Sequence, residues 1–285
     1  MSRFQTSWEI AKRSWAVLRS DKSLAWFPVL SALASVAVIA VLGGLIAVAG
    51  IDGSPTGDSL APIGWVLIVV AYLALAFVQT YFLAGLVAGA DMRLHGQDST
   101  VRTALEVANS KLHRLLPWAI VSATVSLIIS MVERQGIIGR IIGSLIGLAW
   151  NLITFMTVPI LVIEDLGVGA ALKRSKDLFQ HTWGENVIAQ GGLGIVGVLV
   201  AIPGVLLFVA GAALGTVGLI VLGAVGLMWL LGSSVIMSAL SGIYRTALYR
   251  YASTGEVPGD FAGIDFQAQF RPRRIGRGGT GFGRS

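Results

Sequence analysis

Long uncharged apolar runs alternate with short charged segments along the whole chain. A helix needs about 20 mostly apolar residues to cross a bilayer, and six stretches reach about that length without an interior charge. These stretches are residues 24–50, 63–90, 115–132, 141–163, 187–210 and 214–243. The pattern therefore predicts an all-α integral membrane bundle of about six transmembrane helices. The turn between the last two stretches carries no charge, so five spans plus a long buried hairpin stay open as an alternative.

A charged segment with apolar residues at helical spacing precedes each pair of spans. In residues 1–23 the apolar stripe consists of Phe4, Trp8, Ala11, Trp15 and Leu18. Residues 91–114 repeat this pattern, and residues 164–186 repeat it more weakly. We therefore predict three amphipathic helices, and three repeated units of helix plus hairpin with boundaries near residues 90 and 163.

Composition points to lipid as the solvent of the chain. Apolar residues make up 55 % of the 285 residues and charged residues only 13 %, whereas soluble domains contain about 25 % charged residues. The chain has no cysteine, which excludes disulfides, thiolate nucleophiles and cysteine-bound metal centres. A soluble enzyme is not compatible with these totals.

Basic residues gather in alternate connections. Nineteen of the 21 Lys and Arg residues lie in residues 1–23, 91–114, 164–186 and after residue 243. Connections rich in Lys and Arg stay in the cytoplasm, so we predict a multi-pass inner-membrane protein with both termini cytoplasmic. The first run is too long for a signal-peptide core and is expected to remain as a span.

The predicted organisation has three parts. Residues 1–23 form a cytoplasmic amphipathic helix, residues 24–251 a six-span membrane domain, and residues 252–285 a disordered basic tail. The tail contains one GRGG sequence, a feature of some segments that bind single-stranded nucleic acid. An anionic membrane surface is the nearer partner of such a tail, so we predict no nucleic-acid partner.

The amphipathic helices are predicted to lie in the headgroup layer, because indole rings prefer that depth and Lys and Arg are attracted to anionic lipid. The residues expected to contact lipid headgroups are Trp8, Lys12, Arg13, Trp15, Lys173, Arg174 and Lys176. A role as solvated linkers packed against one another is the alternative for these helices.

Glycine is abundant, with 36 residues, which is typical of closely packed membrane helices. Glycines four residues apart share one helix face and let a neighbouring helix approach. Two such faces are predicted to pack against a helix: Gly85 and Gly89 in the second span, and Gly139, Gly143 and Gly147 in the fourth. That helix belongs to this chain, to a second copy or to a membrane partner protein, and the sequence leaves the choice open.

The six predicted spans contain few polar side chains. Gln79 and Asn151 are the strongest, and each is expected to bond across to another helix or to line the path of a neutral or amphiphilic solute. Pro159 and Pro203 are expected to bend the fourth and fifth spans.

Two carboxylates, Glu164 and Asp165, follow the fourth span directly. Neighbouring acids suit acid–base chemistry, and a metal site that combines them with Asp91 and His95 is one alternative. Charge also ends a hydrophobic helix, and Asp165 is suited to cap the helix that follows. Since no HExxH, HxH or DxxxD spacing occurs, we predict no metal, cofactor or catalytic residue. An enzyme acting on lipid headgroups through the acid pair and a histidine stays open.

Two motifs stand near the ends of the membrane domain: SWEIAKRSWAVLRSDKSLAWFPVLS at 7–31 and YRTALYRYASTGEVP at 244–258. Together they resemble the opening and closing motifs of a prokaryotic membrane-protein family of unknown function. PILVIEDLGVGAALKRSKDL at 159–178 resembles a wider group that includes the membrane domain attached to some glycerophosphodiester phosphodiesterases. The resemblance implies a multi-span helical protein without an assigned reaction, and no catalytic residue is carried over.

The sequence therefore favours a non-enzymatic component that interacts with membrane lipids or supports membrane assembly. A transporter or channel for a neutral or amphiphilic solute, using Gln79 and Asn151, is the alternative.

Overall fold

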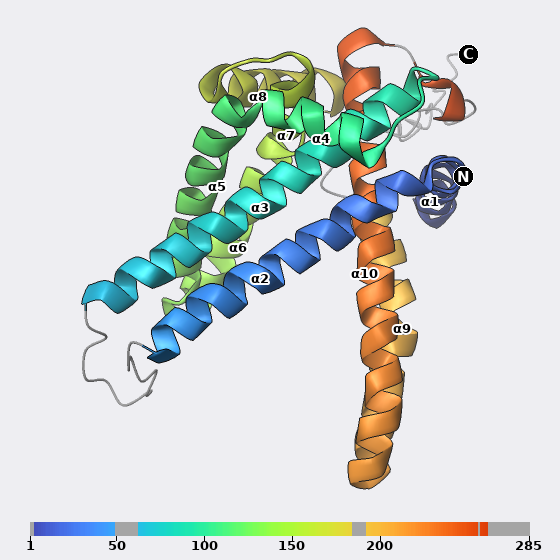
Figure 1. Ribbon diagram of the computed structural model, residues 1–285. Helices are drawn as coiled ribbons and strands as arrows, with labels where there is room; N and C mark the ends of the chain where they lie inside the picture. Colours follow the sequence, from blue (N-terminus) through green and yellow to red (C-terminus); the bar gives the residue numbers. More distant parts are fainter. Residues whose placement is uncertain (1–2, 49–61, 184–191, 256, 262–285) are drawn as a thin grey trace, which may run out of the picture.

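The computed structural model describes residues 3–48, 62–183, 192–255 and 257–261, and all its regular elements in these ranges are helical (Figure 1). The elements are α1 (Arg3–Ser20), η1 (Lys22–Ala25), α2 (Trp26–Val48), α3 (Pro62–Leu94), α4 (Val101–Ser110), α5 (Leu112–Glu133), α6 (Gly136–Thr154), α7 (Thr157–Ile163), α8 (Val168–Trp183), α9 (Gly192–Ala213), α10 (Gly215–Thr254) and η3 (Gly259–Phe261).

Among the described residues, six helical segments are long and apolar enough to cross a membrane: Lys22–Ala47, Val66–Leu94, Leu112–Glu133, Gly136–Ile163, Val196–Ala213 and Gly215–Thr254. The predicted all-α, six-span membrane fold is thus confirmed, and the chain is a multi-pass membrane protein. Helices α9 and α10 are separate helices that meet at Leu214, and each is long enough to cross a membrane, which favours six spans over the alternative of five.

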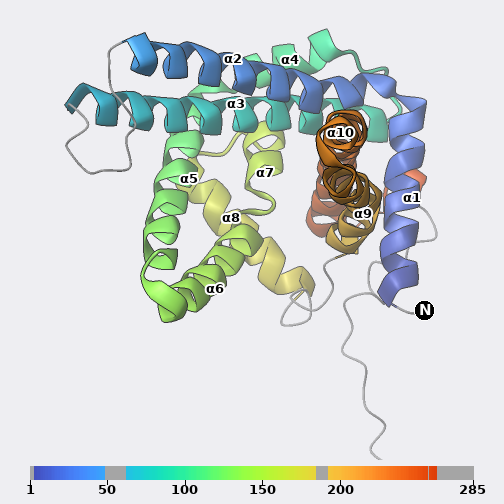
Figure 2. The same cartoon turned by 90° about the horizontal axis from the view of Figure 1, so that it is seen from below.

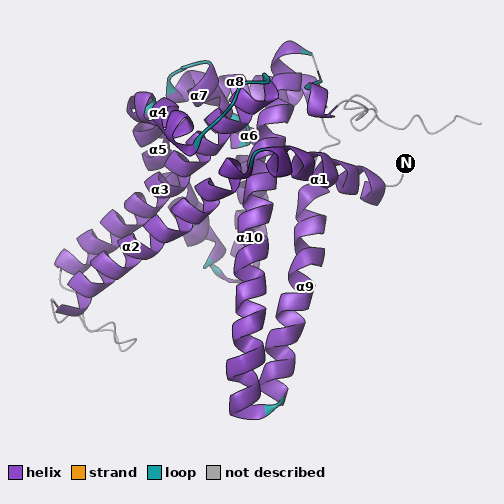
Figure 3. Ribbon diagram, turned by 45° about the vertical axis from the view of Figure 1, so that its right-hand side comes forward, coloured by secondary structure: helices purple, strands orange, loops and turns teal. Residues whose placement is uncertain are grey.

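The spans form three hairpins that diverge from one another. Helices α2 and α3 run side by side, as do α9 and α10, and the two pairs point in different directions (Figures 1 and 3). Helices α5 and α6 form the third pair, with α7 and α8 beside them (Figure 2). A short helix comes before each pair in the element order. Internal symmetry among the three units stays a prediction.

The fourth span is broken rather than simply bent. Helix α6 ends at Thr154 and α7 begins at Thr157. Pro159 lacks the N–H that would bond the carbonyl of Phe155, and its ring clashes with that carbonyl in a regular helix. By contrast, α9 continues through Pro203 without a break. Of the two prolines expected to bend a span, Pro159 interrupts its helix and Pro203 does not.

One end of the bundle carries α4, α8 and the C-terminal part of α10, and α1 crosses α9 and α10 near it (Figures 1 and 3). We call this the basic end, because α4 and α8 belong to the Lys- and Arg-rich segments 91–114 and 164–186. The α5–α6 and α9–α10 turns lie away from it (Figure 1). The identity of the membrane, and the side on which the basic end lies, stay predictions; the connection 51–62 lies almost wholly outside the described residues.

Helix α1 buries only part of the predicted stripe. Ala11 and Leu18 are buried together with Ile10, Ser14 and Val17, whereas Trp8 is 55 % exposed and Trp15 is 46 % exposed. The buried face is therefore shifted from the predicted stripe toward Ile10 and Val17. The exposed tryptophans remain available to the surrounding membrane.

The chain remains ordered beyond the start of the predicted tail at residue 252. Helix α10 continues to Thr254, where Gly255 (φ 77°) ends it with the left-handed conformation that suits glycine. Phe261 in η3 is completely buried and anchors the segment against α1. The arginine-rich part of the tail lies outside the described residues.

The glycine faces pack within this chain. A Cβ on Gly85 would lie 2.7 Å from Cε1 of Phe27, and one on Gly89 would lie 2.9 Å from Cδ2 of Leu24, so α3 approaches η1 and α2 closely. In α6, Cβ atoms on Gly139 and Gly143 would meet Val132 and Glu133 at the end of α5, while one on Gly147 would lie 3.5 Å from Ile129.

Candidate functional site

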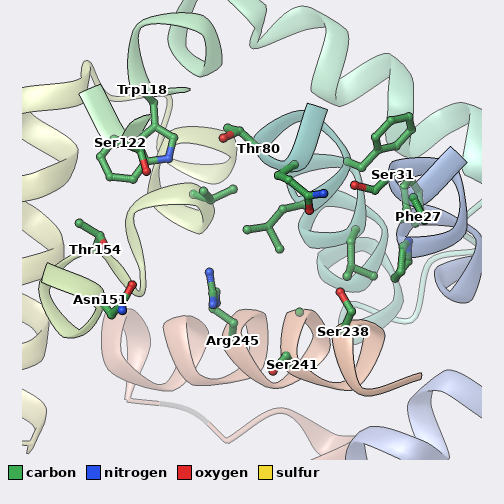
Figure 4. A pocket seen from close by; sticks show the side chains of 18 of the residues that line it. Phe27, Ser31, Thr80, Trp118, Ser122, Asn151, Thr154, Ser238, Ser241 and Arg245 are labelled. Carbon is green, nitrogen blue, oxygen red and sulfur yellow. The ribbon is translucent and has the colours of Figure 1, made fainter. Parts of the chain in front are cut away.

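A polar cavity of about 520 Å³ lies where the hairpins diverge (Figure 4). Its walls come from α2, α3, α5, α6, α7 and α10. Trp118 and Trp150 stack within this wall with ring centroids 6.1 Å apart. The polar side chains in the lining are Ser31, Gln79, Thr80, Ser122, Ser126, Asn151, Thr154, Ser234, Ser238, Ser241 and Arg245. So many polar groups between apolar helices are costly in lipid, and this cavity is therefore a candidate functional site.

One face of α10 supplies the polar stripe Ser234, Ser238, Ser241 and Arg245. These residues follow helical spacing, so they line one side of a continuous helix. The sequence prediction ended the sixth span at Ile243 and therefore found no ionisable residue within the spans. Helix α10 continues beyond Ile243 to Thr254 and brings Arg245 into the cavity together with the serines.

The guanidinium of Arg245 points into the cavity (Figure 4). Its Cζ lies 4.5 Å from the ring centroid of Phe155, a cation–π contact. Nε is buried without a hydrogen-bond partner, and no carboxylate of the described residues pairs with this arginine. Across the cavity, the Ser31 hydroxyl belongs to a side chain that is only 7 % exposed, and within the described chain it too is without a partner.

Gln79 and Asn151, the two residues predicted to line a solute path, both border this cavity. The side-chain amide of Gln79 donates to Oγ of Ser35, 3.2 Å away, so it also bonds α3 to α2 as the structural alternative expects. The fold therefore brings together two polar residues that lie 72 positions apart in the sequence. A path through the membrane stays a prediction.

A second hollow is apolar and lies between α1 and the α9–α10 hairpin. This groove has a volume of about 780 Å³, and its lining residues are Trp8, Ala11, Lys12, Trp15, Val196, Val200, Val225, Met228, Trp229, Gly232, Ser233, Ile236, Met237 and Leu240. Trp229 is fixed by a 2.8 Å hydrogen bond from its indole nitrogen to the carbonyl of Val200. Three residues predicted to contact lipid headgroups, Trp8, Lys12 and Trp15, thus border one groove.

The remaining predicted headgroup residues differ in their surroundings. Lys173 and Lys176 are exposed on α8, and Arg13 is half-buried on α1. Arg174 instead pairs with Glu164, with Nε 3.3 Å from Oε1. Its charge is therefore partly neutralised by a group of the same chain.

The acid pair has two separate sets of partners. Oε1 of Glu164 accepts a 2.8 Å hydrogen bond from the Tyr249 hydroxyl as well as the contact with Arg174. Asp165 lies 3.3 Å from Nζ of Lys111 and 3.6 Å from Nε of Arg114. The hydrogen bond from Lys111 holds the pKa of the Asp165 carboxyl below its usual range. The two acids therefore join α7 to α4, α5, α8 and α10.

Asp165 also ends a helix. Its φ of 55° is the left-handed conformation that follows a helix C-terminus, and Asp tolerates it better than most residues. Glu164 is the C-cap of α7, and α8 begins only at Val168. The prediction that Asp165 caps the following helix is wrong, because it terminates the preceding one.

The acids considered for a metal site are engaged elsewhere. Asp91 binds Arg250 through two hydrogen bonds, of 2.7 and 2.9 Å. His95 lies 3.2 Å from Nη2 of the same arginine. Across the described residues, no group of three or more His, Asp or Glu side chains is arranged to hold a metal ion. Ion pairs, rather than a ligand cluster, occupy this end of α3.

A family described as of unknown function (DUF6159) has a model that matches residues 62–259, more than half of the chain. The chain belongs to this family. The matched range includes the closing motif at 244–258 and begins after the opening motif at 7–31. No curated protein and no solved structure matches the chain. The likeness to the membrane domain of phosphodiesterases has no support among these findings.

Proposed function

We propose that this protein is a non-enzymatic membrane component that holds a phospholipid in the groove between α1 and the α9–α10 hairpin. The observation that carries the proposal is the groove itself, which has an apolar floor and a rim formed by Trp8, Lys12 and Trp15. An amphiphilic ligand with an anionic head and acyl chains matches both parts, because the ammonium group attracts the head and the floor buries a chain.

The length of the groove fits an acyl chain. Its floor extends along α10 from Val225 to Leu240, which corresponds to about 22 Å at the rise of an α-helix. One leaflet of a bilayer contributes about 15 Å of hydrocarbon. A chain that enters beside α1 therefore finds apolar surface along its whole length.

Charge at the basic end supports the same choice of ligand. Lys12 is the one charged residue of the groove lining in the described chain, and Lys173 and Lys176 are exposed on α8. Each such cation near an anionic leaflet contributes about 1 kcal/mol of attraction. We expect the basic end to face the cytoplasmic leaflet of the inner membrane and to bind phosphatidylglycerol in preference to phosphatidylcholine.

Gly232→Phe is expected to displace the lipid. Gly232 lines the groove, and a Cβ there meets nothing within 4 Å, so the new ring enters the groove without a backbone clash. Excluding about two methylene groups of the chain costs about 1.6 kcal/mol, or about tenfold in affinity. Native mass spectrometry of protein from nanodiscs containing phosphatidylglycerol measures the retained lipid.

Gly44→Phe is the matched control, because Gly44 has equally open surroundings and lies on α2 outside the groove. This variant is expected to retain lipid as the wild type does. Equal retention by the wild type and Gly232→Phe would contradict the proposal.

A second function, transport of a neutral or amphiphilic solute, is favoured by the polar cavity that Gln79 and Asn151 both border. We expect the variant carrying Gln79→Leu and Asn151→Leu to slow the flux of glycerol or of a labelled short-chain phospholipid across proteoliposomes. Thr124→Leu, a polar-to-apolar change on α5 outside the cavity lining, serves as control. A flux that is unchanged in the double variant would remove the basis for this function.

A further inference from the structure

Arg245 differs from arginines near it at the basic end. Arg250 is paired with Asp91 and Arg174 with Glu164. No such pair, and no hydrogen bond, is made by Arg245 within the part of the chain that the structure describes. Its guanidinium nevertheless points into the cavity (Figure 4). The cation is therefore held in place without an anion of the described chain to neutralise it.

The N–H of Arg245 Nε is buried and makes no hydrogen bond within the described residues, which is unfavourable because a buried donor without a partner has lost its water. The Ser31 hydroxyl in the opposite wall has the same deficit, since it is buried and also lacks a partner within the described residues. A group with several acceptor oxygens in the cavity would offer acceptors to the guanidinium and would lie in the same cavity that Ser31 lines. A guanidinium binds carboxylate or phosphate through two parallel hydrogen bonds, a match that few other groups achieve.

The depth of Arg245 suits a lipid head. It lies thirty residues after the first residue of α10, about 45 Å along the helix. The hydrocarbon core of a bilayer is about 30 Å thick, so a helix that enters it near Gly215 leaves it before Arg245 and carries Arg245 toward the headgroups. Ser241 and Ser238 continue the polar wall toward the hydrocarbon, and Leu83 and Leu86 provide apolar surface beside it.

We propose that the polar cavity binds the anionic oxygens of a phosphate or carboxylate group, with Arg245 as the cation and the Ser31 and Ser241 hydroxyls as further donors. The site lies apart from the groove beside α1, so this inference does not rest on the lipid held there. The group comes either from a lipid head or from a small anion in water, and both sources share the same chemistry.

The test compares three proteins purified in a neutral detergent: the wild type, Arg245→Gln and Arg245→Lys. Phosphatidic acid, phosphatidylcholine and inorganic phosphate are titrated separately, and the rise in melting temperature gives each dissociation constant. We expect Arg245→Gln to weaken binding of phosphatidic acid about tenfold or more, and Arg245→Lys to weaken it less, because lysine keeps the charge but not the bidentate geometry. Arg102→Gln is the charge-matched control, since the Arg102 side chain is 88 % exposed.

A purely structural role for Arg245 gives a different result. Because the cation is uncompensated when the site is empty, Arg245→Gln without ligand should melt no lower than the wild type. Stabilisation of the wild type by inorganic phosphate, lost in Arg245→Gln, would support an anion taken from water. Stabilisation by phosphatidic acid alone, lost in the same variant, would support a lipid head.

Equal constants for phosphatidic acid in the wild type and Arg245→Gln, or a lower melting temperature of the ligand-free variant, would overturn the inference. Gly232→Phe separates the two sites. If this groove variant weakens binding of phosphatidic acid and Arg245→Gln does not, the groove proposal stands and the cavity proposal fails. If Arg245→Gln alone weakens binding of phosphatidic acid, the cavity proposal stands and the groove proposal fails.

Discussion

Arg250→Gln is expected to destabilise the folded protein by about 2 kcal/mol. Arg250 binds Asp91 through two hydrogen bonds of 2.7 and 2.9 Å, and their side chains are only 23 % and 19 % exposed. A hydrogen bond to a charged group contributes about 1.5–3 kcal/mol, and a truncated partner leaves the other charge poorly solvated. The pair joins the ends of α3 and α10, 159 residues apart, so its loss frees two helices at the basic end.

A double-mutant cycle with Asp91→Asn isolates the coupling between the two side chains. Arg102 and Glu106 give the matched control, because their 2.9 Å ion pair is 88 % and 59 % exposed on a single helix. Exposed pairs of this spacing contribute about 0.3–0.5 kcal/mol. Unfolding in mixed micelles should therefore give a clearly larger coupling for the partly buried pair of Arg250 and Asp91. A coupling no larger than that of the control would show that the contact does not hold α3 to α10.

The sequence sufficed for the spans because length and hydropathy determine which segments can cross a bilayer. It did not place the break in the fourth span, although Pro159 indicated one. The break lies at Phe155 and Met156, where the carbonyl opposite the missing N–H is found. A proline disturbs the helix at the carbonyl four residues before it. The position of the break could therefore have been predicted from Pro159.

The cavity was only half visible in the sequence. Gln79 and Asn151 stood out as polar groups within apolar runs, but Arg245 was excluded when the sixth span was ended at Ile243. The serines at 234, 238 and 241 recur at helical spacing and point to Arg245 as the next member of the stripe. The sequence therefore contained a signal for Arg245. It did not show that Arg245 has no carboxylate partner among the described residues, because partners far apart in sequence meet only in the folded bundle.

Helix α1 shows a further limit. Its sequence contains two neighbouring apolar stripes, and periodicity alone does not distinguish the stripe that packs on protein from the one that faces lipid. Packing of α1 buried Ile10 and Val17 as well as Ala11 and Leu18, and left Trp8 and Trp15 at the rim of the groove beside α9 and α10. The position of the groove follows from this choice, and therefore required the structure.

The prediction that the whole basic end lies on one side of the membrane can be tested by labelling single cysteines. The chain has no cysteine, so single cysteines report their own positions without a background. Glu106→Cys, Gln180→Cys and Thr254→Cys mark α4, α8 and the end of α10, while Gln135→Cys and Thr216→Cys mark the α5–α6 and α9–α10 turns. Both proposed sites depend on this topology, because each takes its ligand at the level of the headgroups of one leaflet.

Labelling of these five variants with a membrane-impermeant maleimide, in sealed vesicles of either orientation, tests the account most directly. We predict that the cysteines at 106, 180 and 254 react only from the cytoplasmic side and those at 135 and 216 only from the opposite side. Reaction of residues 106 and 254 from opposite sides of the membrane would contradict the six-span arrangement and both binding sites built on it.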